Sequence, residues 1–544
     1  MKGENIFEAM SFIDVELIEK ADKAPKKAGK KPHIPKKRHK ITWISSVAAA
    51  MVALILCSVI LLNNVISPGS SLIGDTTTAS GNGIHAPNGD TTTSPGNDIH
   101  APNGDTTTSP GNDIHVPNGD TTTSPGNDIY VPNDNLLLTY SVASPSYPIM
   151  AKYTSDYNSD EYDEWRKALW KQREYYGAGR NLAGFFNSST KSILGDATTE
   201  NAVYSPVNVY MTLAMLAEIS SGETRQQILD TLGAESIEEL RIQANSVWNA
   251  CYRDDGQTTS RLASSLWLNE NIRYGDCTAL TQNYYASVFH GDMGSDEYSK
   301  AYTEWLKKET GGYLNGVIDD EKFDSSTIMV LVSTLYFQAS WNTEFNKELT
   351  KKSVFHSPTG DIQCDFMNEK NGLGTYYYGE MFSATYKHLG NDGMMYFILP
   401  DENISISELL SNDEALAFIN NPGTGVNVAT CQVNLSLPKF DISMKKDIIS
   451  DIKALGITEC FDDKNANFSE FFPDNSPYVT KMEHGVRVSV DEKSCSGAAY
   501  VRLDMWGGYP PPEVVDFTLD RPFIFVITSP DGLPLFVGVV NQPV

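Results

Sequence analysis

Apolar residues are distributed very unevenly along the chain. An uncharged apolar run extends from Trp43 to Leu62, and its roughly 20 residues are enough to cross a bilayer as a helix. Apolar and aromatic residues are sparse between 67 and 135, and they become frequent again near residue 180. The pattern therefore predicts a membrane span, a polar spacer and a large folded body, in that order.

From residue 180 onward, helical and strand periodicities alternate. Helical spacing comes first, and Pro206 suits the first turn of its helix. The longest strand pattern, 327–341, contains no Gly or Pro, so it is expected to be a central strand covered on both faces. We predict an α+β domain over 180–544. Its expected helices are 181–194, 206–216, 222–232 and 302–314, and its other strands are 202–204, 394–400, 433–438, 479–492 and a hairpin of 523–528 with 535–540.

Residues 74–133 are four copies of a 15-residue unit rich in Gly, Pro, Asn, Asp and Thr. Each unit has too few apolar side chains to bury a core, so turn-rich or extended chain is expected. One His recurs in most units, but a single His on a flexible unit supplies no preformed metal site, and duplication explains the period. We predict a stalk over 67–135, followed by a polar, tyrosine-rich lead-in over 136–179.

The formal net charge is −27, and the basic residues are clustered only between Lys20 and Lys40. This balance argues against nucleic acid as a partner. The basic flank predicts a cytoplasmic tail over 1–40, a single-pass anchor over 41–66 and a body outside the cell. A cleaved signal peptide and a lipid-modified Cys57 are the alternatives, but neither has the small residues that its processing site needs.

Competing chemistry is absent from the sequence. It contains no Gly-x-Ser-x-Gly, His-Glu-x-x-His, Gly-x-x-x-x-Gly-Lys or Cys-x-x-Cys motif. No pair among its seven cysteines has metal-ligand spacing, and most are expected to act as small hydrophobic residues. We therefore expect no enzyme activity, no cofactor and no metal.

The C-terminal region carries a specific resemblance. The segments 517–527 and 535–543 resemble the signature of the serpin family, with Asp520, Arg521, Pro522, Phe523, Phe525, Phe536, Gly538 and Pro543 in place. Three further segments agree in order, namely 201–206, 336–341 and 437–440 leading to 455–458. The resemblance spans roughly 180–544.

The resemblance implies a fold of three β-sheets and about nine helices, with a metastable central sheet and an exposed reactive-centre loop. A target protease cuts the loop and is trapped as an acyl-enzyme, while the cut loop inserts into the central sheet as a new strand. The implied partner is a target protease, and the inhibitor is expected to be a monomer.

The loop itself can be tested for its ability to become a strand, because side chains of a strand alternate between two faces. From Cys495 to Met505 one parity is entirely small or apolar, whereas the other carries every polar and charged residue. The predicted hinge is the small-residue segment Ser494, Cys495, Ser496, Gly497, Ala498 and Ala499. In the family, Gly is usual at 494, Thr at 495 and a small residue at 500, where this chain has Ser, Cys and Tyr. Cys495 is also a candidate redox-sensitive point, because an oxidised thiol would not enter a core.

Counting from Glu492 places the reactive bond between Gly508 and Tyr509. No Lys or Arg lies in the five residues before this bond, so a trypsin-like target is not expected. An elastase-, subtilisin- or chymotrypsin-like serine protease, or a papain-like cysteine protease, fits better.

Ser205, Ser333 and His484 correspond to the family's "shutter" beneath the sheet, where a buried His hydrogen-bonds to a neighbour. That neighbour is usually Asn and here is Ser333, whose shorter side chain could require a bridging water.

The sequence also leaves an alternative function open. A non-inhibitory serpin has a long exposed loop that does not insert efficiently, and such a scaffold on a membrane anchor could serve as a cell-surface binding or adhesion module.

Overall fold

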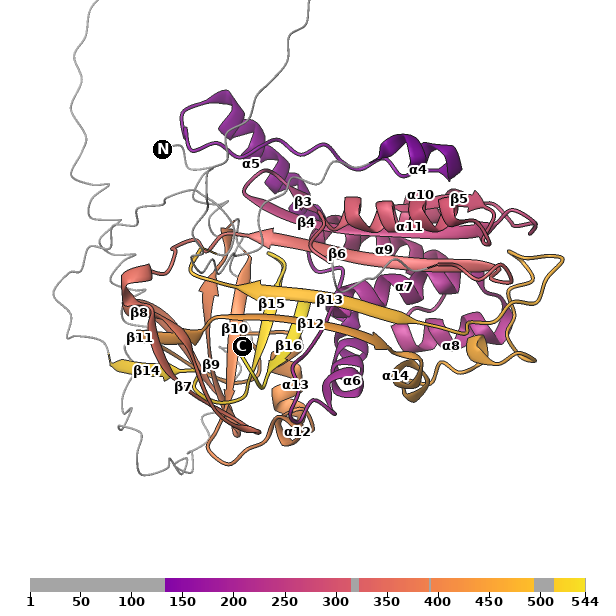
Figure 1. The fold of residues 1–544 in the computed structure, drawn as a ribbon. Helices are drawn as coiled ribbons and strands as arrows, with labels where there is room; N and C mark the ends of the chain where they lie inside the picture. Colours follow the sequence, from indigo (N-terminus) through magenta and orange to yellow (C-terminus); the bar gives the residue numbers. More distant parts are fainter. Residues whose placement is uncertain (1–132, 315–321, 391–392, 494–512, 544) are drawn as a thin grey trace, which may run out of the picture. The chain divides into compact units, whose positions relative to one another are not determined.

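The computed structural model describes residues 133–314, 322–390, 393–493 and 513–543 (Figure 1). The predicted tail, the predicted anchor and nearly all of the predicted stalk lie outside these residues. Within the described part of the chain, no helix is both long and apolar enough to cross a bilayer.

The described residues form eleven α-helices, of which nine lie in the predicted domain and two in the lead-in. Side-chain oxygens of Ser205, Ser236 and Ser295 cap three of the long helices at their N-termini. Gly233, at φ +70°, ends another helix in the left-handed conformation that favours glycine. The lead-in helices are α4 (Asp134–Tyr140) and α5 (Asp160–Gln172); the others are α6 (Ala183–Leu194), α7 (Pro206–Ile219), α8 (Gly222–Leu232), α9 (Ile237–Cys251), α10 (Thr278–Asn283), α11 (Asp296–Glu309), α12 (Ile406–Leu409), α13 (Asp413–Asn420) and α14 (Ile449–Ala454).

Hydrogen bonds join the strands into three groups. In the first, the order is β1-β5-β4-β3, and β6 also pairs with β4; the bounds are β1 (Ser141–Ala143), β3 (Arg253–Asp254), β4 (Thr258–Asn269), β5 (Ala286–Gly291) and β6 (Met329–Ala339). The second is the pair β12 (Phe440–Asp447) and β13 (Glu483–Val490). The third contains β2 (Ala202–Tyr204), β7 (Lys351–Ser357), β8 (Gly360–Tyr378), β9 (Phe382–His388), β10 (Met394–Pro400), β11 (Asn427–Pro438), β14 (Val514–Thr518), β15 (Phe523–Thr528) and β16 (Pro534–Val540).

The predicted C-terminal hairpin is confirmed as β15 and β16, which are fully buried. The predicted central strand is confirmed as β6, but its burial differs from the expectation, because most of its residues are only half-buried. Helices α7 and α11 pack against it, yet among the described residues only β4 shares a backbone ladder with it. A strand paired along one edge keeps part of its surface accessible at the other.

Strands β6 and β13 run in the same direction without a ladder between them in the described residues (Figure 1). Their C-terminal ends meet, since the indole Nε1 of Trp341, just after β6, donates a hydrogen bond of 2.9 Å to the carbonyl of Asp491, just after β13. The central sheet is therefore present as two parts, β1-β5-β4-β6 and β12-β13.

The lead-in is folded against the body rather than separate from it. Strand β1 pairs with β5 and so extends the sheet by one short edge strand. The indole of Trp165 in α5 donates to the Asp255 carboxylate at 3.1 Å, and the buried Gln172 amide donates to three backbone carbonyls at the C-terminal end of α9. These buried contacts make α5 an integral part of the described fold.

The C-terminal end of α4 lies at the end of the sheet that is away from Asp491. Strand β6 begins at Met329 at the same end where β5 finishes at Gly291, and Tyr140 of α4 packs against Gly291. Trp341 and Asp491 lie at the other end. Figure 1 accordingly shows α4 opposite the arrowheads of β6 and β13.

Candidate functional site

The predicted hinge, Ser494, Cys495, Ser496, Gly497, Ala498 and Ala499, and the predicted reactive bond, Gly508–Tyr509, lie outside the described residues. What the structure describes are the two roots of this segment. One is the stretch after β13 that ends at Lys493, and the other is Glu513, just before β14.

Backbone and side-chain contacts fasten both roots. The backbone N–H of Phe345 donates to the carbonyl of Glu492 at 3.0 Å, beside the Trp341–Asp491 hydrogen bond. On the other side, the N–H of Gln432 donates to the carbonyl of Glu513 at 2.8 Å, and β14 then continues parallel to β11. The segment between the roots thus starts and finishes at fixed points.

The Glu492 side chain anchors the first root. Its buried carboxylate lies 2.8 Å from the Lys439 ammonium and accepts a hydrogen bond of 2.9 Å from the Thr350 hydroxyl. Burial opposes ionisation, but the hydrogen bonds from Lys439, from the backbone and from Thr350 together outweigh it and lower the pKa of Glu492. The carboxylate is therefore ionised at neutral pH and ties the end of β13 to the start of β12.

A cavity of about 70 Å³ separates the C-terminal halves of β6 and β13. Arg487 of β13 forms one wall and is held by two hydrogen bonds to Asp441, of 2.9 and 2.7 Å. The lining is largely apolar and comes from both strands and from the sheet beneath: Tyr313, Tyr336, Phe337, Gln338, Ala339, Leu389, Met395, Arg487, Val488, Ser489, Val490, Ile527 and Phe536.

The direction of the two strands determines what could fill the gap between them. A chain that leaves β13 at Glu492 and turns back would run antiparallel to β13, and also to β6, because the two strands are parallel. Antiparallel strands can be joined by a short turn, and they satisfy backbone N–H and C=O groups on both neighbours. The arrangement can therefore accept one additional strand between β6 and β13.

Beneath the middle of the sheet, the structure brings two of the three predicted shutter residues into contact. The backbone N–H of Ser205 donates to Nε2 of His484 at 3.0 Å. Ser333 has other partners, since its hydroxyl accepts from Ser264 at 3.2 Å and its carbonyl accepts from the amide Nδ2 of Asn208 at 3.0 Å. The described residues contain no hydrogen bond between His484 and Ser333.

Asn208 is the residue of this cluster that the sequence analysis missed. It lies one helical turn after Ser205, whose side chain accepts a hydrogen bond of 3.2 Å from the N–H of Asn208. An amide of this cluster therefore comes from the helix, but its partner is the Ser333 carbonyl and not His484. Pro206 is the sequence signal that could have identified Asn208, because it starts α7 and places positions 205 and 208 on the same turn.

Helix α7 therefore holds both strands from below. Its first turn binds His484 of β13 through Ser205 and Ser333 of β6 through Asn208. Nearly every residue of the helix is buried, so it cannot shift without disturbing the core.

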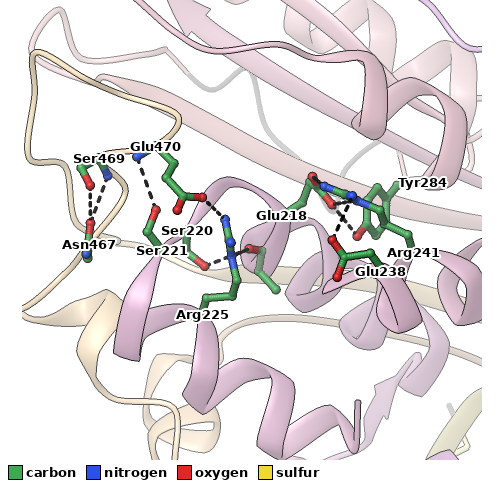
Figure 2. Close-up of polar contacts among 11 residues, drawn as sticks. Glu218, Ser220, Ser221, Arg225, Glu238, Arg241, Tyr284, Asn467, Ser469 and Glu470 are labelled. Carbon is green, nitrogen blue, oxygen red and sulfur yellow. Dashed lines mark hydrogen bonds and ion pairs between the residues drawn. The ribbon is translucent and has the colours of Figure 1, made fainter. Parts of the chain in front are cut away.

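The other end of α7 is fixed by a network of ion pairs (Figure 2). Arg241 of α9 donates to both carboxylate oxygens of Glu218 at 2.8 and 2.6 Å, and the Tyr284 hydroxyl donates to the same carboxylate at 3.1 Å. Burial, with Glu218 beside it, raises the pKa of Tyr284, so the phenol remains a donor. Arg225 bridges the end of α7 to Glu470, in the segment that leads to β13, at 2.7 Å.

The five described cysteines are all free and buried, as expected of small hydrophobic residues. They are Cys251, Cys277, Cys364, Cys431 and Cys460. Within the described residues, no group of three or more His, Cys, Asp or Glu side chains is arranged to hold a metal ion.

Comparison with known proteins identifies the class that this fold and split sheet define. Residues 182–543 match the family model "Serpin (serine protease inhibitor)". The chain belongs to the serpin family, whose members are described as serine protease inhibitors rather than as enzymes.

The similarity to individual relatives extends over nearly the whole length of each relative. The chain is 27% identical to Serpin-ZX of Arabidopsis thaliana over 369 residues, which covers 63% of this chain and 92% of the relative. It is 26% identical to the alpha-1-antiproteinase of Rattus norvegicus over 382 residues, or 68% and 90% of the two chains. The native state of a thermophilic serpin, tengpin, is 26% identical and superposes with a TM-score of 0.58, covering 72% of this chain and 97% of that one.

We predict that Asn208→Ala lowers the stability of the native state. Loss of the amide leaves the half-buried carbonyl of Ser333 without this donor, at a cost of about 0.5–1.5 kcal/mol. The midpoint of urea unfolding should fall, whereas Asn283→Ala, which removes an amide bonded only within α10 at Ala279, should leave it nearly unchanged. Equal midpoints for the two variants would contradict the role assigned to Asn208.

We also predict an acid-sensitive contribution from His484. Burial lowers its pKa from the ordinary value of 6.5 to about 4. The unfolded chain therefore binds the proton first, and stability falls as the pH is lowered from 6.5 toward 4, by about 3 kcal/mol at most.

The measurement is urea unfolding at pH 7 and at pH 4.5. His484→Asn should lose less stability between these pH values than the parent. His356→Asn is the control for replacing a histidine, because the His356 side chain is exposed. An unchanged pH dependence in His484→Asn would refute the prediction.

Proposed function

We propose that this serpin is a suicide-substrate inhibitor of a protease outside the cytoplasm. Its loop between Glu492 and Glu513 is cut, and the freed end inserts between β6 and β13 while the protease remains attached as an acyl-enzyme. The observation that carries the proposal is the pair of parallel strands, fastened at their ends but sharing no ladder in the described residues.

Two further observations support insertion. The loop sequence from Cys495 to Met505 alternates as a buried strand requires, with every charged residue on one parity. Relatives of the chain include proteins named alpha-1-antiproteinase and plasminogen activator inhibitor 1, which are inhibitors by name.

The loop composition narrows the target class. No Lys or Arg precedes the nominal Gly508–Tyr509 bond within five residues, so an elastase-, subtilisin- or chymotrypsin-like serine protease is proposed first. A papain-like cysteine protease is the second choice, because it also forms an acyl-enzyme.

The proposal is tested by incubating the full-length chain with such proteases and searching for a complex that survives boiling in detergent. A matched pair of variants sharpens the test. Ala499→Arg places a charge on the inward parity, and burying an unpaired Arg costs roughly several kcal/mol, so complex should give way to simple cleavage. Ala498→Arg, one residue earlier and on the outward parity, should keep most of the complex.

Thermal unfolding before and after loop cleavage is the companion measurement. Insertion should raise the melting temperature of the cut parent and of cut Ala498→Arg, but not of cut Ala499→Arg. Clean cleavage without complex and without a rise in melting temperature would instead favour the alternative, a non-inhibitory binding module.

We further propose that the chain is anchored in the cell membrane by residues 41–66, with its N-terminus in the cytoplasm and the serpin domain outside. The support is the uncharged run Trp43–Leu62 next to a basic flank. Replacing Ala53 and Leu54 with Arg adds two charges at the centre of this run, which costs roughly 5–7 kcal/mol of insertion energy. The parent should fractionate with membranes and be cut by a protease added outside intact cells, whereas the double variant should lose membrane association. Membrane association that survives both charges would refute the anchor.

A further inference from the structure

The segment Asp134–Ala143, comprising α4 and β1 and called the strap below, precedes the part of the chain that matches the family. It nevertheless packs on α11 and β5, the helix and edge strand on one side of the split sheet. Its contacts show how strongly it is attached and what it restrains.

Leu137 provides the apolar attachment. Its side chain is only 6% exposed and belongs to a separate buried cluster with Trp267 of β4 and with Tyr298 and Trp305 of α11. A buried Leu of this kind contributes about 2–5 kcal/mol relative to Ala. Asp134 adds an exposed ion pair of 2.7 Å with Lys308 near the end of α11, which contributes little by itself.

Tyr140, near the end of the strap, packs where only a glycine at position 291 leaves enough space. The ring of Tyr140 lies 4.9 Å from the ring of Tyr298, and both pack on Gly291 at the end of β5. A Cβ at position 291 would come within 2.7 Å of Tyr298 and 2.9 Å of Tyr140. The β1–β5 ladder follows directly, with Ser141 opposite Phe289.

The turn after α11 reaches across the cavity between the two parts of the sheet. The carbonyl of Tyr313 accepts a hydrogen bond of 3.3 Å from Arg487 of β13, and the Arg487 guanidinium lies 5.1 Å from the Tyr313 ring centre. On the other side, the Tyr313 ring lies 6.3 Å from the ring of Tyr336 in β6. Tyr313 therefore spans the place where an additional strand would enter.

Insertion of a strand between β6 and β13 thus requires Tyr313 to move, and its displacement acts on the C-terminal end of α11, which it follows in the chain. Because α11 packs on one side against β6 through Val330 and Val332 and on the other against the strap, its displacement must break one of these contacts or carry the strap along. We propose that the strap holds α11 in place and thereby slows the opening of the sheet. This inference rests on the proposed function, since it concerns the step that admits the loop.

The decisive comparison uses two adjacent leucines in the full-length chain. Leu137→Ala removes the buried side chain, whereas Leu138→Ala removes a neighbour that is 70% exposed. Hydrogen exchange of the α11 amides should accelerate at least roughly tenfold in Leu137→Ala, the fold-change equivalent to about 1.4 kcal/mol, and should stay at the parent rate in Leu138→Ala.

A second readout connects the strap to the sheet. A synthetic peptide with the sequence 494–505 of this chain is added in excess, and its rate of uptake into the uncut protein is followed. Uptake should be several-fold faster in Leu137→Ala than in the parent or in Leu138→Ala. Equal α11 exchange in all three proteins, or faster exchange with unchanged uptake, overturns the proposal.

A surface variant protects the test against misfolding. Asp134→Arg places like charges opposite Lys308 and should accelerate α11 exchange by a smaller factor, about two- to threefold, which Lys308→Asp in the same chain should reverse. If no protein takes up the peptide and none forms a protease complex, the proposed function is contradicted, whereas the α11 exchange rates still decide whether the strap holds α11.

Discussion

The rest of this structure depends on the contacts that helix α7 makes with β6 and β13. The first turn of α7 binds β13 through the Ser205–His484 hydrogen bond and β6 through the Asn208–Ser333 hydrogen bond. The described residues contain no backbone ladder between β6 and β13. The contacts with α7 therefore connect these two strands where backbone hydrogen bonds would connect neighbouring strands elsewhere in a sheet. Each of these two hydrogen bonds contributes only about 1 kcal/mol to stability, whereas a full ladder contains many such bonds. A strand that paired with both β6 and β13 would therefore add to the stability of the sheet.

The remaining restraints act at different places along the same opening. Trp341 and Phe345 close the end from which the loop departs, and Tyr313 crosses the front of the cavity between the strands. At the far end, Arg225 and Glu470 connect α7 to the segment that precedes β13. Each restraint is local and modest. Together they fasten β6 and β13 at several separate places.

The sequence predicted what local patterns and the family resemblance encode. The buried β15–β16 hairpin and the helices α6, α7, α8 and α11 followed from local patterns, and the serpin fold followed from the resemblance. The expected partner of His484 was Ser333, whereas the structure pairs His484 with the backbone N–H of Ser205. Asn208 was missed because its partner is the carbonyl of Ser333, more than a hundred residues away in the sequence, and this pairing is visible only in three dimensions. The incomplete burial of β6 was missed because its apolar sequence is typical of a strand with a neighbouring strand on each side. In the described fold, β6 pairs with β4 alone. The fold of the lead-in was missed because its buried anchors are single side chains in a mostly polar segment: Trp165 is flanked by charged residues, and of the leucines at 136–138 only Leu137 is buried. The hinge and the reactive bond remain predictions.

The order of attachment along the lead-in has a mechanical consequence. The described chain begins at Asn133 and passes through α4 first, β1 next and α5 last. Tension applied at Asn133 therefore loads α4 and the short β1 edge before it reaches Trp165 and Gln172. Elements loaded in series detach in order, so such a force would separate the strap from α11 while the buried contacts of α5 still hold.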